Sequence, residues 1–268
     1  MDDQNSLGTF LRERRARLDP TAFGLPLGRR RTPGLRREEV AQRAHVSATW
    51  YTWLEQGRGG APSADVLDRL AGALALNEAE REHLFLIAQD RPPKVHRSGH
   101  PGVTPQLQRV LDALADSPAV VKTPEWTIVG WNRAASMVLA NYNNIPPERR
   151  NVLRMLFSGT RDHLPDWKSV ARLIVGAVRR DIQRAGVTDE TRALLDELTA
   201  TSAEFREIWA EQDVSAYGEG TKHLNHRVVG SLHLEYSTFD IDGRPDLALV
   251  IFNPATDADR AKIRRLLA

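Results

Sequence analysis

A stretch rich in proline and glycine at residues 90–105 divides the chain, and it constrains the fold more than any other feature. It reads DRPPKVHRSGHPGVTP and holds four prolines and two glycines, residue types that interrupt helices and strands. The length of 268 residues also favours two domains, because one domain commonly holds about 100–200 residues. We therefore predict an N-terminal domain at residues 1–90, a linker at residues 91–104 and a C-terminal domain at residues 105–268.

Helical periodicity fills the N-terminal domain. Leu7, Leu11 and Leu18 mark one face of a first helix. Ser47 and Ser63 stand at positions typical of helix N-caps. The further helices are predicted at residues 36–44, 47–56, 63–75 and 77–88. Five short helices with almost no strand signal predict a small all-α domain.

The C-terminal domain shows a mixed pattern. The segment AVVKTPEWTIVGWN predicts two short strands around a turn at Pro124. Near the end of the chain, VVGSLHLEYSTFDI and DLALVIFNP predict two more strands, joined at Asp242-Gly243, a dipeptide typical of tight hairpins. We interpret Gly218, Glu219 and Gly220 as a flexible turn before these strands. Amphipathic helices are predicted at residues 133–141, 148–157, 167–185, 189–199 and 202–211, with a last helix from Asp257.

This order of elements predicts an α+β domain in which helices cover an antiparallel sheet. Strands come first, helices follow in the middle, and a hairpin closes the chain. A single sheet with helices packed over one side satisfies that order. Such an arrangement leaves room for a pocket between the sheet and the helices.

The segment LRREEVAQRAHVSATWYTWLEQGR, residues 35–58, has the pattern of a helix-turn-helix. Ala41 is the small residue that allows the two helices to approach each other. Tyr51 and Leu54 continue the buried face of the second helix. The residues that then face outward are Ala48, Thr49, Thr52 and Trp53. A helix fits the major groove of DNA, where Thr and Ala side chains can contact base edges.

Basic charge is concentrated in this part of the chain. Residues 8–58 hold 11 arginines and no lysine against 5 acidic residues, whereas residues 98–268 hold 21 basic residues against 22 acidic ones. Arginine presents a planar fork of donors that suits phosphates and base edges. We predict that Arg29, Arg30 and Arg31 contact the DNA backbone or the minor groove, with a solvated loop as the alternative. Ser47 and Arg58 complete the predicted DNA-contacting residues.

Several segments resemble the Xre-type helix-turn-helix of phage-repressor-like bacterial regulators. They are LGTFLRERRARL, RRRTPGLRREEVA, WYTWLEQGR and PSADVLDRLAGALALNEAEREHLFLIA, and they cover residues 7–88. More narrowly, the second and third are similar to the MmyB-like transcription regulators, which join this domain to a PAS-like ligand domain. Residues 105–268 resemble that second domain through EWTIVGWNRAA, RRNVLRMLF, TSAEFREIWAEQDV and VVGSLHLEY.

The resemblance implies roles for individual residues and for partners. It places Arg37 at the start of the first helix of the motif, in contact with a phosphate. It pairs Arg15 with Glu55 in a structural ion pair rather than a DNA contact. His45 departs from the family pattern, because glycine with a left-handed backbone usually holds this turn position; His adopts that conformation more readily than most residues. The implied partner is double-stranded operator DNA. We also expect a homodimer, because one recognition helix buries too little surface for tight specific binding and helix-turn-helix proteins usually read paired half-sites.

The resemblance also implies that the C-terminal domain is a receptor for a long apolar molecule such as a fatty acid. A carboxylate head group would need a donor among the apolar helical runs. The predicted ligand-binding residues are Asn132, Met137, Arg150, Asn151, Met155, Arg179, Phe205, Trp209 and Tyr236. The alternative is that these residues form an ordinary core and that the domain serves only dimerisation or protein docking.

Other classes of protein are disfavoured. The chain has no cysteine, which excludes disulfides, zinc fingers with thiolate ligands and iron–sulfur clusters. It has no glycine-rich phosphate loop and no GxSxG motif, and His223, His226 and His233 lack metal-ligand spacing. No apolar run approaches the roughly 18 residues of a membrane span, and the segment MDDQNSLGTF lacks a signal pattern. We expect a cytoplasmic regulator without catalytic residues, metal or cofactor other than a bound fatty acid or similar ligand.

Overall fold

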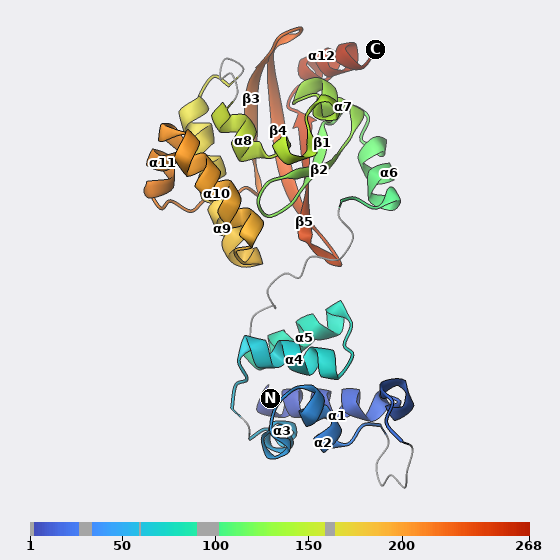
Figure 1. Ribbon diagram of the computed structural model, residues 1–268. Helices are drawn as coiled ribbons and strands as arrows, with labels where there is room; N and C mark the ends of the chain where they lie inside the picture. Colours follow the sequence, from blue (N-terminus) through green and yellow to red (C-terminus); the bar gives the residue numbers. More distant parts are fainter. Residues whose placement is uncertain (1–2, 27–33, 59, 90–101, 159–163) are drawn as a thin grey trace. The chain divides into compact units, whose positions relative to one another are not determined.

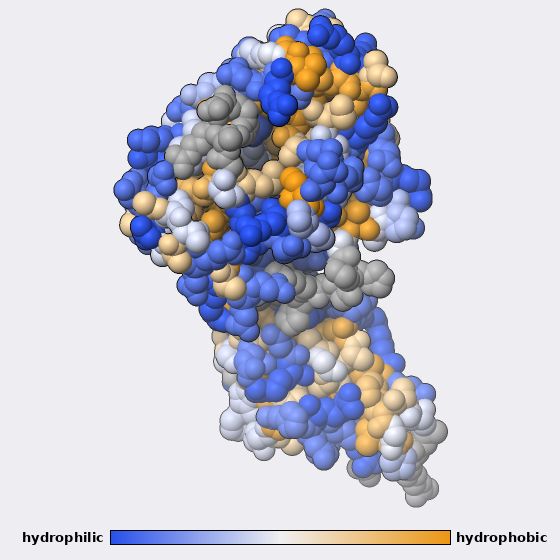
Figure 2. All heavy atoms as spheres, turned by 45° about the horizontal axis from the view of Figure 1, so that its top comes forward, coloured by the Kyte–Doolittle hydropathy of each residue, from blue (hydrophilic) through white to orange (hydrophobic). Residues whose placement is uncertain are grey.

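The computed structural model describes residues 3–26, 34–58, 60–89, 102–158 and 164–268. The chain forms two compact units, Met1–Pro93 and Lys94–Ala268, whose elements are drawn in Figure 1. The division falls within the stretch rich in proline and glycine. Figure 2 shows hydrophilic side chains over much of the visible surface of each unit, with apolar residues gathered in patches between them. Arg29, Arg30 and Arg31 lie outside the described residues.

The first unit is built from α-helices around one apolar core. Its elements are α1 (Asp3–Arg17), a 3-10 helix (Pro20–Phe23), α2 (Arg37–Arg43), α3 (Ala48–Glu55), α4 (Ala64–Ala73) and α5 (Glu78–Gln89). The predicted all-α unit is confirmed, and the four helices with predicted bounds end within two residues of those bounds. The predicted caps also form, because Ser47 Oγ accepts from the Trp50 amide and Ser63 Oγ from the Val66 amide. These N-caps set the residues at which α3 and α4 begin.

The second unit contains one five-stranded antiparallel sheet. Its strands are β1 (Ala119–Lys122), β2 (Ile128–Trp131), β3 (Glu219–His226), β4 (Gly230–Ile241) and β5 (Arg244–Pro254), in the order β2-β1-β5-β4-β3. The predicted hairpin at Asp242-Gly243 is confirmed, with Gly243 at a φ of +72°. The antiparallel α+β fold is therefore the predicted one.

The edge strand β3 corrects one prediction. The sequence predicts a turn at Gly218, Glu219 and Gly220 and places the start of the next strand at Val228. In the structure β3 starts at Glu219 and pairs along its whole length with β4. Its sequence, EGTKHLNH, has one large aliphatic residue, Leu224. The alternation of apolar and polar residues that marks a strand is therefore almost absent from it.

Helices lie on both faces of the sheet (Figure 1). They are α6 (Pro105–Ala113), α7 (Arg133–Val138), α8 (Val152–Ser158), α9 (Trp167–Ala185), α10 (Asp189–Thr201), α11 (Ala203–Ala210) and α12 (Asp257–Leu267). The main core joins α7–α12 to one face. On the other face, α6 packs Leu111 against Val121 and Leu247. The sequence did not predict α6, which starts within the proline-rich stretch after its N-cap Thr104. Among the described residues no helix is long and apolar enough to cross a membrane.

Candidate DNA-reading helix and ligand pocket

The helix α3 is fixed in place by its turn and by its buried face. The turn before it contains His45 with a φ of +52°, the left-handed conformation expected at this position. Ala41 of α2 is buried where the two helices pack. Tyr51 and Leu54 of α3 are buried in the core of the first unit. The predicted helix-turn-helix geometry is thus present.

The opposite face of α3 carries the side chains predicted to read bases. Thr49 is exposed, Trp53 is 50% exposed, and Ala48 and Thr52 are partly exposed. The hydroxyl of Thr52 donates to the Ala48 carbonyl at 2.8 Å, so its own helix already holds it. At the two ends of α3, Ser47 and Arg58 are also exposed. The four side chains lie on one accessible helix face; base contact by them stays a prediction.

A buried carboxylate links α3 to α1 and α2. Glu55 is buried, and Arg15 binds both of its oxygens, through Nε at 2.6 Å and Nη2 at 3.1 Å. Arg37 Nε donates to Glu55 Oε2 at 2.7 Å. Burial by itself would raise the pKa of Glu55, but the hydrogen bonds from Arg15 and Arg37 outweigh it and lower this pKa. The implied Arg15–Glu55 pair is therefore present.

Arg37 is both bound to Glu55 and partly exposed. Its Nε is held by Glu55, yet 40% of its side chain is exposed. Arg37 is the first residue of α2, and the bond to Glu55 fixes the direction of its partly exposed side chain. This is compatible with the phosphate contact that the resemblance implies, and that contact stays a prediction.

Two asparagines predicted to bind ligand have their amide groups occupied within the protein. Asn132 Oδ1 accepts from the Ala119 and Ala135 amides at 3.0 and 2.8 Å. Its Nδ2 donates to the carbonyls of Leu111, Leu114 and Ser117. Asn151 is likewise buried, and its Nδ2 donates to the Glu125 carbonyl at 2.7 Å. Both side chains hold backbone segments together.

Two arginines predicted as head-group donors also bond to backbone carbonyls. Arg150 Nε donates to the carbonyls of Tyr142 and Ile145 at 3.0 and 2.8 Å. Arg179 Nη2 donates to the Trp209 carbonyl at 2.6 Å, and its guanidinium lies 4.3 Å from the centre of the Trp209 ring. Each guanidinium therefore joins separate segments of the chain.

The apolar residues predicted to bind ligand are dispersed. Phe205 is fully buried and its ring stacks on Trp209 with centroids 5.6 Å apart. Met155 packs against the main core, whereas Met137 is exposed. The ring of Tyr236 stacks on Tyr217. None of the nine residues belongs to the lining of the pocket that the structure describes at the edge of the sheet.

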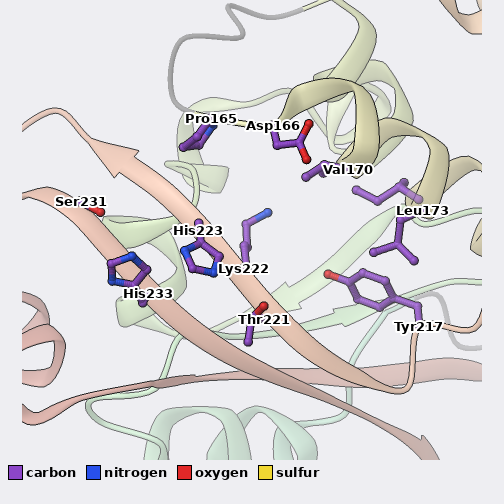
Figure 3. Close-up of a pocket in the computed structure, with 11 residues that line it drawn as sticks. Pro165, Asp166, Val170, Leu173, Tyr217, Thr221, Lys222, His223, Ser231 and His233 are labelled. Atoms are coloured by element: carbon purple, nitrogen blue, oxygen red, sulfur yellow. The ribbon is translucent and has the colours of Figure 1, made fainter.

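That pocket has a volume of about 400 Å³ and lies between β3 and the start of α9 (Figure 3). Its size is within the range of about 300–1,000 Å³ common for small-molecule sites. Val170, Leu173 and Ile174 of α9 form an aliphatic wall. The other lining residues are Pro165, Asp166, Tyr217, Thr221, Lys222, His223, Ser231 and His233. The pocket thus combines an apolar wall with a polar side formed largely by strand residues.

Lys222 is the pocket residue that sequence reasoning missed most clearly. It shares the inner face of β3 with Leu224, a residue of the main core. Figure 3 shows its ammonium pointing into the pocket. Among the described residues its ammonium has no hydrogen-bond or ion-pair partner, and it lies 6.0 Å from the centre of the Phe252 ring. Burial lowers the pKa of Lys222. The sequence did not predict β3, and without this strand nothing indicates that Lys222 faces inward.

Two protein-family models match the chain. A helix-turn-helix domain model matches residues 6–84, and the model of the MmyB-like transcription regulator ligand binding domain matches residues 103–266. The chain belongs to the MmyB-like transcription regulators. No curated protein matches it. In this MmyB-like regulator, α3 lies in the DNA-binding domain and the pocket beside β3 lies in the ligand-binding domain.

Proposed function

We propose that this regulator binds operator DNA as a homodimer in the cytoplasm and senses a long-chain apolar acid, such as a fatty acid, in the pocket beside β3. The observation that carries the proposal is the aliphatic wall of Val170, Leu173 and Ile174 in a pocket of about 400 Å³. The pocket belongs to the domain matched as ligand-binding. An aliphatic wall favours a hydrocarbon chain, because burying apolar surface is the main favourable term in binding such a ligand.

The size of α3 supports a dimer. This helix has eight residues, and four of its side chains face outward. A single recognition helix buries less than the roughly 1,000–2,500 Å² typical of specific DNA complexes. Helix-turn-helix proteins commonly reach that area by binding two half-sites about 34 Å apart. A ligand that favours one spacing of the two α3 helices would then change operator affinity by shifting populations.

The proposal is tested with dodecanoate and a variant that fills the pocket. Leu173→Trp adds volume at the aliphatic wall, whereas Val187→Trp adds the same side chain at an exposed position. We expect dodecanoate to change the operator Kd by about tenfold, within the usual range of allosteric coupling. This change should occur in the wild type and in Val187→Trp and be absent from Leu173→Trp. Fluorescence anisotropy with labelled operator measures it.

Three other results would contradict the proposal. An operator Kd that dodecanoate does not change in the wild type or in either variant would favour a C-terminal domain that only dimerises or docks another protein. Native mass spectrometry showing a monomer on operator DNA would exclude the dimer. Conversion of dodecanoate to a product would make the domain an enzyme, since the proposal requires binding without turnover.

The base-reading face of α3 is tested by Thr49→Ala. Thr49 is exposed on that face, and its hydroxyl and methyl group can contact different base edges. We expect the variant to lose about 1 kcal/mol of discrimination at one base pair of the operator. Affinity for unrelated DNA should remain unchanged, because phosphate contacts carry non-specific binding. Thr201→Ala, an exposed threonine of α10, is the matched control. Equal losses on all sequences would remove Thr49 from base reading.

A further inference from the structure

We infer that Lys222 and the hydroxyl of Tyr217 hold one carboxylate head group, so that the effector is an aliphatic monoanion whose head lies at β3. This inference rests on the proposed function, because it assumes that the pocket receives an apolar ligand. It assigns the head group to residues that lie in or next to an edge strand of the sheet. The hydrocarbon chain would then lie against Val170 and Leu173 of α9.

Two lysines on the same sheet face differ in the partner of their ammonium groups, and Lys222 is also the more exposed of the two. Lys122 of β1 is buried, and its Nζ bonds to Asp181 Oδ2 at 2.8 Å; it also lies 4.1 Å from the Trp126 ring centre. Lys222 of β3 points into the pocket, and no described residue bonds to its ammonium. A charge removed from water is costly unless it is paired. The fold provides a resident counterion for Lys122 and leaves that of Lys222 to be supplied by a ligand.

The Tyr217 hydroxyl is a second donor for the same ligand. Its ring stacks on Tyr236 with centroids 4.1 Å apart and meets Trp126 edge-on at 4.7 Å, so its direction is fixed. Figure 3 shows the hydroxyl pointing into the pocket toward the side of Lys222. No described residue bonds to it. Burial raises the pKa of Tyr217, so the phenol keeps its proton and can donate to a carboxylate oxygen.

The charges around the pocket favour a single negative charge on the ligand. The described lining of the pocket contains one carboxylate, that of Asp166, and one ammonium group, that of Lys222. The Asp166 carboxylate repels a dianion such as a phosphate monoester more strongly than it repels a carboxylate. The imidazoles of His223 and His233 contact each other edge-on at 4.6 Å, and His233 Nδ1 lies 3.9 Å from Asp259 Oδ2. The unpaired lysine is therefore matched to one carboxylate.

The experiment compares ligands with the same chain and different head groups. Isothermal titration calorimetry would measure binding of dodecanoate, 1-dodecanol and dodecyl phosphate to the full-length protein. We expect the wild type to bind dodecanoate about tenfold more tightly than the alcohol, the scale of a hydrogen-bonded charge. Lys222→Met should abolish that preference while leaving the affinity for the alcohol unchanged. Tyr217→Phe should weaken dodecanoate binding by about threefold.

Controls separate the head-group assignment from folding and from the proposed function. Lys168→Met makes the same change at an exposed residue of α9 and should bind like the wild type. Lys222→Met should melt at or above the wild-type temperature, because it removes an unpaired charge. A preference for the acid that survives in Lys222→Met, or tighter binding of dodecyl phosphate, would overturn the inference and leave the proposed function standing. Binding of none of the three ligands would overturn both.

Discussion

Glu55→Gln is expected to unfold the DNA-binding domain at temperatures at which the C-terminal domain stays folded. The variant leaves the buried guanidinium of Arg15 without its counter-charge, since Arg15 donates to both oxygens of Glu55. Removing one partner of a buried ion pair commonly costs about 3–5 kcal/mol. A whole domain is stable by about 5–15 kcal/mol. Differential scanning calorimetry should show one transition moved to lower temperature, with operator binding lost as a result.

Glu13→Gln is the matched control for this expectation. Glu13 pairs with Arg17 on the surface of α1, where both side chains are largely exposed. Exposed pairs contribute about 0–1 kcal/mol, so this variant should melt close to the wild type. Equal melting temperatures for the two variants would show that the Arg15–Glu55 pair does not hold the domain together.

The effect of Glu55 also has an expected pH dependence. The pKa of Glu55 is lower in the folded chain than in an unfolded one. The stability that this carboxylate contributes is therefore complete above the ordinary pKa of glutamate and is lost as the pH falls through the lowered value. The stability difference between the wild type and Glu55→Gln should accordingly shrink in acid.

Asn132→Ala is expected to destabilise the ligand-binding domain by about 3 kcal/mol or more. The amide of Asn132 makes five hydrogen bonds to backbone groups. Its removal leaves carbonyls and amides of the α6, β1 and α7 region without partners, and each buried unpaired group costs about 1–3 kcal/mol. Chemical denaturation of the wild type and the variant measures the difference.

Asn144→Ala, at an exposed asparagine of the same unit, is the control and should behave like the wild type. The comparison also decides between two roles for Asn132. A variant that keeps its stability and loses only dodecanoate binding would show that Asn132 binds the ligand, as the sequence predicts. A destabilised variant would confirm that the side chain holds the fold.

Local signals explain why the first unit could be predicted in detail. The caps at Ser47 and Ser63, the small Ala41 and the outward face of α3 all depend on residues within one or two helical turns. The edge strand β3 lacks such a signal, because Leu224 is its one large aliphatic residue. The helix α6 was not predicted because it begins at Pro105, inside the stretch rich in proline and glycine that marks the domain boundary.

The candidate ligand site was harder to predict because hydrogen-bond partners lie far apart in the sequence. Arg179 and Asn132 look like free donors when only their neighbours are considered. In the structure, Arg179 bonds to a carbonyl 30 residues away, and Asn132 to one 21 residues away. Lys222 was missed for the opposite reason: nothing in its local sequence indicates that its side chain faces inward. Only the pairing of β3 with β4 places it beside the core.

The position of β3 at the end of the sheet has a consequence for how such regulators diversify. Side chains of an edge strand have a neighbouring strand on one side only, so exchanging them disturbs fewer packed contacts than exchange in a central strand. The residue at position 222 can therefore change while the sheet and α3 stay as they are. If Lys222 holds the head group as we infer, effector choice and operator choice are separable traits, and a related regulator could acquire a new signal and keep its old target sequence.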